Sequence, residues 1–192
     1  EVLKTVAAGD VWIADRNFCT LGFLFGLADR KARFAIRQHG CLQGIPQGQR
    51  RPAGKTAKGE PLWEQAVTIV HEGRSQTIRR ITVELKTPTR DGDRVLHIFT
   101  NLTSREASAA KVAELYGKRW TIEVVFWELQ TALRCEVKTL GYPRAALFAF
   151  CVALMLQNAF SMLHGSLRAV HGKNRVDEEV SGVLLAQELQ KT

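Results

Sequence analysis

The spacing of apolar residues predicts an α/β layer at the start of the chain. Residues 11–15 form a short apolar run that ends in Asp15, which is the pattern of a buried strand with a carboxylate at its carboxyl end. Residues 20–33 have the period of an amphipathic helix, and residues 34–38 form a second strand. The inward side of this helix is expected to hold Leu21, Leu24, Phe25 and Leu27. The strand–helix–strand order predicts one α/β sheet.

The next sixty residues divide into a loop and a β-rich stretch. Residues 40–59 hold five glycines, two prolines and no acidic residue, which predicts a flexible loop. β-Branched and apolar runs at residues 66–70, 77–85 and 95–99, with a turn at 91–93, predict a small antiparallel sheet. We expect this sheet to be inserted before the helix that follows.

A long helix is predicted from about Thr103 to about Leu133. Residues 103–106 fit a capping box, in which the Thr103 hydroxyl and the Glu106 carboxylate satisfy backbone N–H groups. At ~100° per residue, one sector of this helix is apolar and would be buried. The neighbouring sector holds Tyr116, Arg119, Trp120, Glu123, Trp127, Gln130 and Arg134. A solvated, salt-bridged face explains the charges, whereas a functional face also explains the aromatic residues among them.

A second helix is predicted within the strongly apolar residues 142–163, and it lies either under the sheet or in a membrane. Because Gln157, Asn158 and Ser161 interrupt the run where a membrane span would have to continue, the sequence favours a helix packed under the sheet. Residues 171–192 form a polar C-terminal tail.

Composition narrows the class of protein. A chain of 192 residues, 45% hydrophobic and 24% charged, suits one globular domain, alone or with a subdomain. The net charge of +8 favours a polyanionic partner, and nucleic acid first. Four widely spaced cysteines without a C-x-x-C pair predict free thiols. The chain begins at Glu1 without a methionine and shows no signal peptide, so we expect a fragment of a longer cytoplasmic protein.

Basic residues gather in and just before the predicted loop. From Arg30 through Lys58 there are eight Lys or Arg residues and no Asp or Glu. A flexible basic loop is the minimal interpretation, but the absence of a compensating acid favours contact with a phosphate backbone. The candidate DNA-binding residues in this loop are Arg50, Arg51, Lys55 and Lys58.

Two carboxylates are candidates for chemistry, Asp15 at the strand end and Glu123 on the helix. Carboxylates brought together from a sheet and a facing helix suit Mg²⁺ or Mn²⁺, because these ions prefer oxygen ligands. Two such ions can activate a water or a 3′-hydroxyl and stabilise the leaving oxygen in a displacement at phosphorus. The alternative for Asp15 is a turn-forming residue after a strand. The five histidines show no metal-ligand spacing, which argues against zinc hydrolysis.

Two motifs carry a resemblance to a known family. Tyr116, Arg119 and Glu123 match the first three letters of the signature Y-x2-R-x3-E-x6-K, and residues 13–19 resemble the block that holds the second Asp of a DDE triad. The chain therefore resembles DDE transposases of the bacterial insertion-sequence-four family over residues 11–161. The β-rich stretch agrees with the insertion subdomain that this family carries between its second Asp and its Glu.

The resemblance implies an α/β fold: a partial RNase H-like core with an inserted antiparallel β subdomain. Residues 1–45 would belong to the core, residues 46–102 to the basic loop and insertion, residues 103–170 to the core helices, and residues 171–192 to the tail. The first strands, and the first Asp of the triad, would lie upstream of this fragment. Asp10 is too close to Asp15 to fill that role and stands in the turn that leads into the strand.

The resemblance also implies roles for single residues. Asp15 and Glu123 would be the catalytic metal ligands, with two Mg²⁺ or Mn²⁺ ions in the complete protein. Tyr116 and Arg119 would hold phosphates near the transposon end. Trp120 either stacks against an unpaired base or anchors the helix as a buried residue. The final Lys of the signature is Gln130 here, and Arg134, one turn further on, could supply the missing charge.

The favoured function is that of the C-terminal part of a DNA transposase catalytic domain, which cuts insertion-sequence ends and transfers them into target DNA. This fragment alone would be inactive because the first Asp is absent. The alternatives are an RNase H-like nuclease and a non-catalytic DNA-binding remnant of a transposase. The expected partner is double-stranded DNA, both transposon ends and target, bound by a homodimer and without a membrane. The expected location is the bacterial cytoplasm, at the nucleoid.

Overall fold

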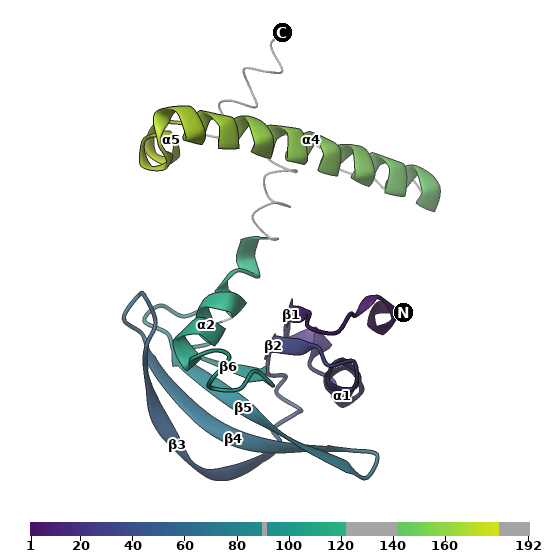
Figure 1. Ribbon diagram of the computed structural model, residues 1–192, viewed down its shortest axis with the longest axis vertical. Helices are drawn as coiled ribbons and strands as arrows, with labels where there is room; N and C mark the ends of the chain where they lie inside the picture. Colours follow the sequence, from purple (N-terminus) through teal and green to yellow (C-terminus); the bar gives the residue numbers. More distant parts are fainter. Residues whose placement is uncertain (90–91, 122–141, 181–192) are drawn as a thin grey trace. The chain divides into compact units, whose positions relative to one another are not determined.

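A computed structural model describes residues 1–89, 92–121 and 142–180 of the chain (Figure 1). The chain divides into two compact units, Glu1–Arg119 and Trp120–Thr192. The three cysteines in the described ranges, Cys19, Cys41 and Cys151, are free thiols, as predicted.

The first unit is built on a six-stranded sheet with the strand order β1-β2-β6-β5-β4-β3. The strands are β1 Val11–Ala14, β2 Arg33–Arg37, β3 Ile45–Lys55, β4 Pro61–His71, β5 Arg74–Glu84 and β6 Val95–Thr100. Only β1 and β2 pair in parallel; the other neighbours pair antiparallel. The helices of this unit are the short turns η1 Val2–Thr5 and η2 Arg16–Phe18, and the α-helices α1 Leu21–Asp29 and α2 Ala109–Gly117.

The predicted strand–helix–strand layer is confirmed by β1, α1 and β2. Helix α1 buries Leu24, Phe25 and Leu27 against the sheet, as its periodicity indicates. It ends at Asp29, four residues earlier than predicted. The reason is local: Lys31 has a φ of 58°, in the left-handed region that terminates a helix.

Helices α1 and α2 cover opposite faces of the sheet, and each face has its own core. The core on the α1 face includes Phe34, Ile36, Ile78 and Phe99. The core on the α2 face includes Ala35, Ile81, Ile98 and Val112. Because successive side chains of a strand point to opposite faces, residue parity assigns every strand side chain to one of these two faces.

The prediction of a flexible loop at residues 40–59 is wrong for most of its length. Residues 45–55 form strand β3, which pairs with β4 at one edge of the sheet. Ten of its eleven residues are exposed, so the sequence has no alternation of apolar and polar residues that would predict this strand. Its pairing with β4 shifts register between Gln47 and Arg51 and again between Pro52 and Lys55. Proline is tolerated here because one side of an edge strand makes no ladder hydrogen bonds.

The β-rich stretch is confirmed as three antiparallel strands, β4, β5 and β6. They do not form a sheet of their own, because β6 pairs with β2 on one side and with β5 on the other. The stretch therefore extends the α/β sheet rather than standing apart from it. The division into domains at residues 45, 102 and 170 stays a prediction.

The predicted helix start at Thr103 is wrong by six residues. Helix α2 begins at Ala109, and the Ser108 side chain accepts the backbone N–H of Lys111 as its N-cap. The capping-box bonds do form: the Glu106 carboxylate accepts the Thr103 N–H and hydroxyl at 2.8 Å each, and the Glu106 N–H donates to that hydroxyl at 3.3 Å. They close a separate turn before the helix. The prediction of one continuous helix is also wrong, because α2 ends at Gly117 and residues 118–119 form a turn. The predicted part from residue 122 to residue 133 lies outside the described residues.

Replacing Glu106 by glutamine is expected to lower stability at neutral pH and to leave acid stability unchanged. Backbone and hydroxyl hydrogen bonds from Thr103, together with Arg33, lower the Glu106 pKa from 4.5 to about 2. A lowered carboxyl pKa stabilises the fold above the unfolded-state value and loses that effect as pH falls from about 4.5 to about 2. Urea unfolding at several pH values tests this. A difference between wild type and variant that stays constant from pH 7 down to roughly pH 2.5 would contradict it.

The second unit contains helices α4 Pro143–His171 and α5 Lys173–Glu179. The predicted apolar helix is confirmed and extends eight residues beyond residue 163. By length and composition it is the one helix in the described ranges that could cross a membrane, with a mean hydropathy of 1.9 over its most apolar window. Core helices pass the same test, so its packing under the sheet stays a prediction.

Candidate active site

Asp15 lies at the carboxyl end of β1, on the α2 face of the sheet. Its backbone is extended, with φ −77° and ψ 172°, so it continues the alternation of β1. Ile13, two residues earlier, packs against the core of the α2 face, and Asp15 therefore shares that face. The Asp15 side chain is half-buried, and within the described ranges nothing forms a hydrogen bond or ion pair with its carboxylate.

Helix α2 brings Tyr116 to the same place. Tyr116 is 3% exposed and belongs to the core of the α2 face. Burial raises the pKa of the Tyr116 hydroxyl; the charges of Arg119 and Arg37 oppose this rise, and the charge of Asp15 adds to it. Because such interactions weaken with distance, Asp15, Arg37, Tyr116 and Arg119 form one neighbourhood. The structure thus brings together three of the residues that the sequence selected.

Arg37 is a member of this neighbourhood that the sequence analysis missed. It ends β2, next to β1, and shares the α2 face with Ala35. Its side chain is only 14% exposed, and it forms an ion pair with Asp93, which precedes β6. The sequence signal that could have identified Arg37 is its position at the carboxyl end of β2. This strand is parallel to β1, which Asp15 follows.

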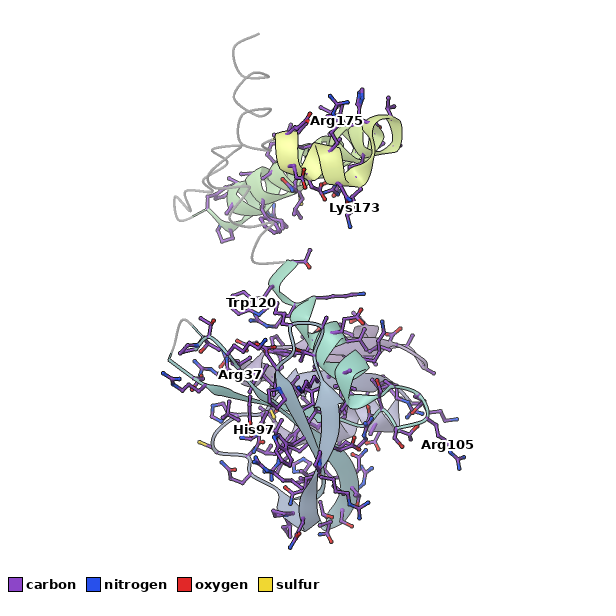
Figure 2. All side chains as sticks on the ribbon, turned by 90° about the vertical axis from the view of Figure 1, so that its left-hand side faces the viewer. Arg37, His97, Arg105, Trp120, Lys173 and Arg175 are labelled. Carbon is purple, nitrogen blue, oxygen red and sulfur yellow. The ribbon has the colours of Figure 1, made fainter. Side chains whose placement is uncertain are left out.

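Arg119 and Trp120 follow the end of α2. The guanidinium carbon of Arg119 lies 5.7 Å from the centroid of the Tyr116 ring, a cation–π distance. Trp120, labelled in Figure 2, follows the end of α2. It is 48% exposed, which favours a surface role over a buried anchor. Its stacking against a base stays a prediction.

The remaining signature positions, Glu123 and Gln130, lie outside the described residues, as does Arg134 beyond them. In the described ranges no three His, Cys, Asp or Glu side chains gather as a metal site. Asp15 offers a carboxylate oxygen, the donor that Mg²⁺ and Mn²⁺ prefer, and Mg²⁺ is usually bound through one or two carboxylates together with substrate phosphates. The described part therefore fits one corner of a metal site, and the predicted second ligand, Glu123, would have to complete it.

Of the four basic residues predicted to share one loop, three lie on strand β3 and the fourth lies in the connection from β3 to β4. Arg50 lies with its guanidinium carbon 4.4 Å from the centroid of the Trp63 ring, and parity places Trp63 on the α1 face. Arg51 pairs in register with Glu64 and lines a pocket beside Ser108 at the start of α2. Lys55 ends β3, and Lys58 lies in the connection to β4, where its carbonyl accepts the Lys86 ammonium. The side chains of Arg50 and Arg51 thus lie on opposite faces of the sheet.

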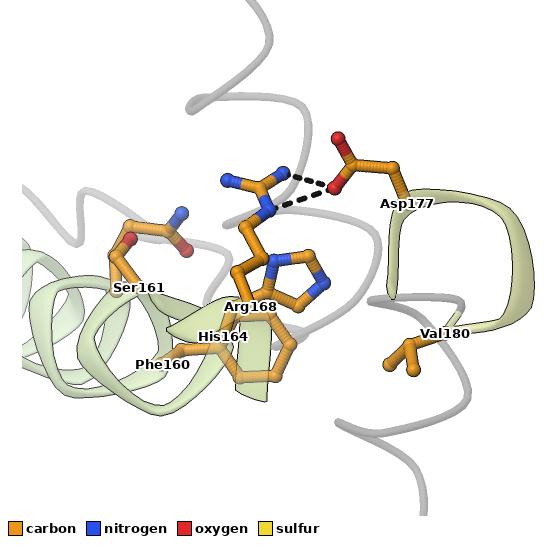
Figure 3. Close-up of a pocket in the computed structure, with 7 residues that line it drawn as sticks. Phe160, Ser161, His164, Arg168, Asp177 and Val180 are labelled. Atoms are coloured by element: carbon orange, nitrogen blue, oxygen red, sulfur yellow. Dashed lines mark hydrogen bonds and ion pairs between the residues drawn. The ribbon is translucent and has the colours of Figure 1, made fainter. Parts of the chain in front are cut away.

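A pocket at the corner between α4 and α5 holds Ser161, His164 and Asp177, residue types found together in hydrolases (Figure 3). The Asp177 carboxylate accepts the Nε and a terminal nitrogen of Arg168 at 2.7 and 2.6 Å. In the described ranges no hydrogen bond joins Ser161 to His164, whose ring stacks on Phe160. The pocket is therefore a helix corner fixed by an ion pair.

Comparison with known proteins indicates the family of this chain. The family described as "Transposase DDE domain" matches residues 1–159. A protein of Sinorhizobium fredii (strain NBRC 101917 / NGR234), named "Putative transposase y4zB", is 30% identical over 134 residues, and the match covers 66% of this chain and 35% of that protein. The chain spans about a third of the length of this curated relative. Because the family match covers more than half of the chain and includes Asp15, Tyr116, Arg119 and Glu123, this chain belongs to the transposase DDE domain family.

Proposed function

We propose that this chain is part of the catalytic domain of a DNA transposase of the insertion-sequence-four family, and that the complete protein cuts insertion-sequence ends and joins them to target DNA. The observation that supports this most directly is the half-buried Asp15 carboxylate beside Tyr116 and Arg119, with no ion-pair partner in the described ranges. A structural carboxylate in such surroundings would normally be paired. A carboxylate without such a partner is suited to act as a metal ligand.

The metal ligands in this proposal are Asp15 and Glu123, and the ions are Mg²⁺ or Mn²⁺. Glu123 is the fourth residue after Arg119, so a helical path would place both on the same side of the helix. When bound, the ions supply an activated water or 3′-hydroxyl and stabilise the leaving oxygen.

The residues around Asp15 have distinct tasks in this proposal. Arg119 binds a phosphate of the transposon end, and the buried Tyr116 ring beneath it fixes the position of the guanidinium. Arg37 holds the carboxyl end of β2 in place through its ion pair with Asp93. Trp120 stacks on an unpaired base at the protein surface, and Gln130 and Arg134 contact the DNA backbone.

The fold in this proposal is RNase H-like, and the first Asp of the triad comes from a strand outside this chain. Strand β1 is the outermost strand on its side of the sheet, so its outer edge can accept such a strand. The chain alone would then lack one of three carboxylates and would be inactive. The partners are transposon ends and target DNA, bound by a homodimer at the nucleoid in the bacterial cytoplasm.

A strand-transfer assay with the complete gene product tests the proposal. A precut insertion-sequence end, labelled at its 5′ terminus, is mixed with plasmid DNA and Mg²⁺. We expect the label to join the plasmid covalently, and we expect no product with EDTA in place of Mg²⁺. The 192-residue chain is expected to give no product under either condition.

The other outcomes separate the alternatives. Metal-dependent cutting of DNA without a joined product would identify a nuclease. Binding of DNA by the complete protein with neither reaction would identify a non-catalytic remnant. Cleavage by the 192-residue chain alone would show that the first carboxylate is not needed and would contradict the assignment of the site.

A further inference from the structure

The α1 face of the sheet carries a group of polar and basic side chains in addition to its apolar core. We name Arg50, Trp63, Gln65, Arg80, Thr82 and His97 the open-face cluster. Cross-strand pairing joins Trp63 to Thr82 and Thr82 to His97, and joins Gln65 to Arg80 in the next row. These positions share the parity of Ile78 and Phe99, which places them on the face opposite Asp15 and Tyr116.

Hydrogen bonds and stacking fix the cluster. The Arg50 guanidinium lies over the Trp63 ring and donates to the Glu84 carboxylate at 3.3 Å. Arg80 donates to the Gln65 side-chain oxygen, and the Thr82 hydroxyl and His97 Nδ1 are 2.9 Å apart. In the described ranges no carboxylate contacts Arg80. Stacking on an aromatic ring limits the orientations of a guanidinium and leaves its N–H groups at the edge for an acceptor.

Positive groups repel one another within this cluster. Burial lowers the pKa of the Arg80 guanidinium, and the charge of Arg50 lowers it further. Burial also lowers the pKa of His97, and Arg80 and Arg50 both add to that effect. The folded chain therefore holds two arginines together against their mutual repulsion, beside a histidine that is neutral at pH 7, with Glu84 as the acid that contacts Arg50. A bound anion would offset this repulsion.

We propose that the open-face cluster binds the phosphate backbone of duplex DNA, separately from the site around Asp15. Arginine is suited to this role because its planar fork matches two phosphate oxygens, and Gln65 and His97 add polar contacts. The choice of DNA among polyanions rests on the proposed function, whereas the existence of an anion-binding face rests on the cluster itself.

Two DNA-binding faces on one sheet allow two duplexes to be held at once. The duplex that is cut lies at the α2 face, beside Asp15. A second duplex, either target DNA or the continuation of the bound one, lies against the open-face cluster. The sheet would then separate the two DNA segments by its own thickness.

Salt-dependent binding of a duplex of roughly 30 base pairs by the 192-residue chain tests the proposal. The slope of log K against log salt is negative, and each lost phosphate contact reduces its magnitude by about 0.9. Arg50→Gln with Arg80→Gln is therefore expected to reduce that magnitude by roughly 2 and to weaken binding roughly tenfold or more at ~0.1 M salt. The conservative pair Arg50→Lys with Arg80→Lys keeps both charges and is expected to restore the slope.

A matched control removes two charges that belong neither to the open-face cluster nor to the residues proposed to act around Asp15. Arg105 and Lys111 are exposed residues in the turn before α2 and in its first turn (Figure 2 labels Arg105). Arg105→Gln with Lys111→Gln is expected to change the slope far less than the Arg50 and Arg80 pair. Urea unfolding of each variant establishes that the fold is kept.

Three results would overturn the proposal. Equal slopes for both glutamine pairs would show that binding depends on the net charge and not on the position of the cluster. Absence of duplex binding by the wild-type chain would show that the cluster does not bind DNA. A loss of binding to poly-glutamate with unchanged DNA binding would assign the cluster to an acidic protein. None of these results touches strand transfer by the complete protein, so a failure here is distinguishable from a failure of the proposed function.

Discussion

Replacing Asp15 by asparagine is expected to abolish DNA cleavage and strand transfer by the complete protein while the fold is kept. Asparagine has the size of aspartate but no negative charge, and a neutral amide binds Mg²⁺ weakly. Loss of metal-based charge stabilisation, which is worth several kcal/mol, corresponds to a rate reduction of roughly 10³-fold or more. Stability should change little, because in the described ranges the carboxylate makes no hydrogen bond or ion pair. The measurement is the initial rate of end cleavage in Mg²⁺, beside a urea unfolding curve.

Asp10 provides the matched control at the other end of the same strand. Its carboxylate accepts the backbone N–H of Ala7 at 2.9 Å and so has a structural task in the turn before β1. Asp10→Asn is expected to leave cleavage within a factor of a few of wild type. Equal losses of activity in the two variants would mean that Asp15→Asn acts by disturbing the structure around β1 and not by removing a metal ligand. Full activity of Asp15→Asn would exclude it as a ligand.

Replacing Arg79 by alanine is expected to destabilise the first unit by about 3 kcal/mol, because it leaves a partly buried carboxylate and two carbonyls without their donor. The Arg79 side chain is 13% exposed and binds Glu64 with two hydrogen bonds, of 2.7 and 2.9 Å. Its remaining nitrogen donates to the carbonyls of Leu102 and Ala107 at 2.8 Å each. Arg79 thus ties the segment before α2 to the sheet. Urea unfolding at pH 7 measures the loss.

Arg74, on the same strand, is the control for this effect. It pairs with Asp29 across the surface, with 58% and 46% of the two side chains exposed. Exposed pairs contribute little, so Arg74→Ala should destabilise far less than Arg79→Ala. Replacing Arg79 by methionine together with Glu64 by leucine should recover part of the loss, since no charge is then left buried. A loss of less than ~1 kcal/mol for Arg79→Ala would refute the assigned role.

The elements that the sequence predicted correctly are those held in place by the burial of apolar side chains. Strand β2 and helix α1 pack apolar side chains at regular positions, and that regularity is visible in the sequence. Strand β3 was missed because backbone pairing with β4, rather than side-chain burial, holds it in place. The capping box at Thr103 was a correct local signal with a wrong consequence, since the same three bonds can close a lone turn.

The candidate site was predictable where a family motif marked it. Asp15, Tyr116 and Arg119 were identified from the sequence, and the structure brings them together across about a hundred residues of chain. Arg37 was not identified, and of the open-face cluster only Arg50 was, because these residues come from separate strands and meet only through strand register. The division of Arg50 and Arg51 between two faces likewise depends on a register shift in β3, which no local pattern predicts.

Strand β3 also limits how copies of this protein can associate. An exposed edge strand is normally a template onto which a second chain can add a strand. Two prolines, two glycines and two register shifts interrupt the row of donors and acceptors along β3, and its arginines would face those of an identical edge. The sheet therefore resists growth on this side, both by aggregation and by ordered pairing. A homodimer assembled on DNA would have to form through other surfaces.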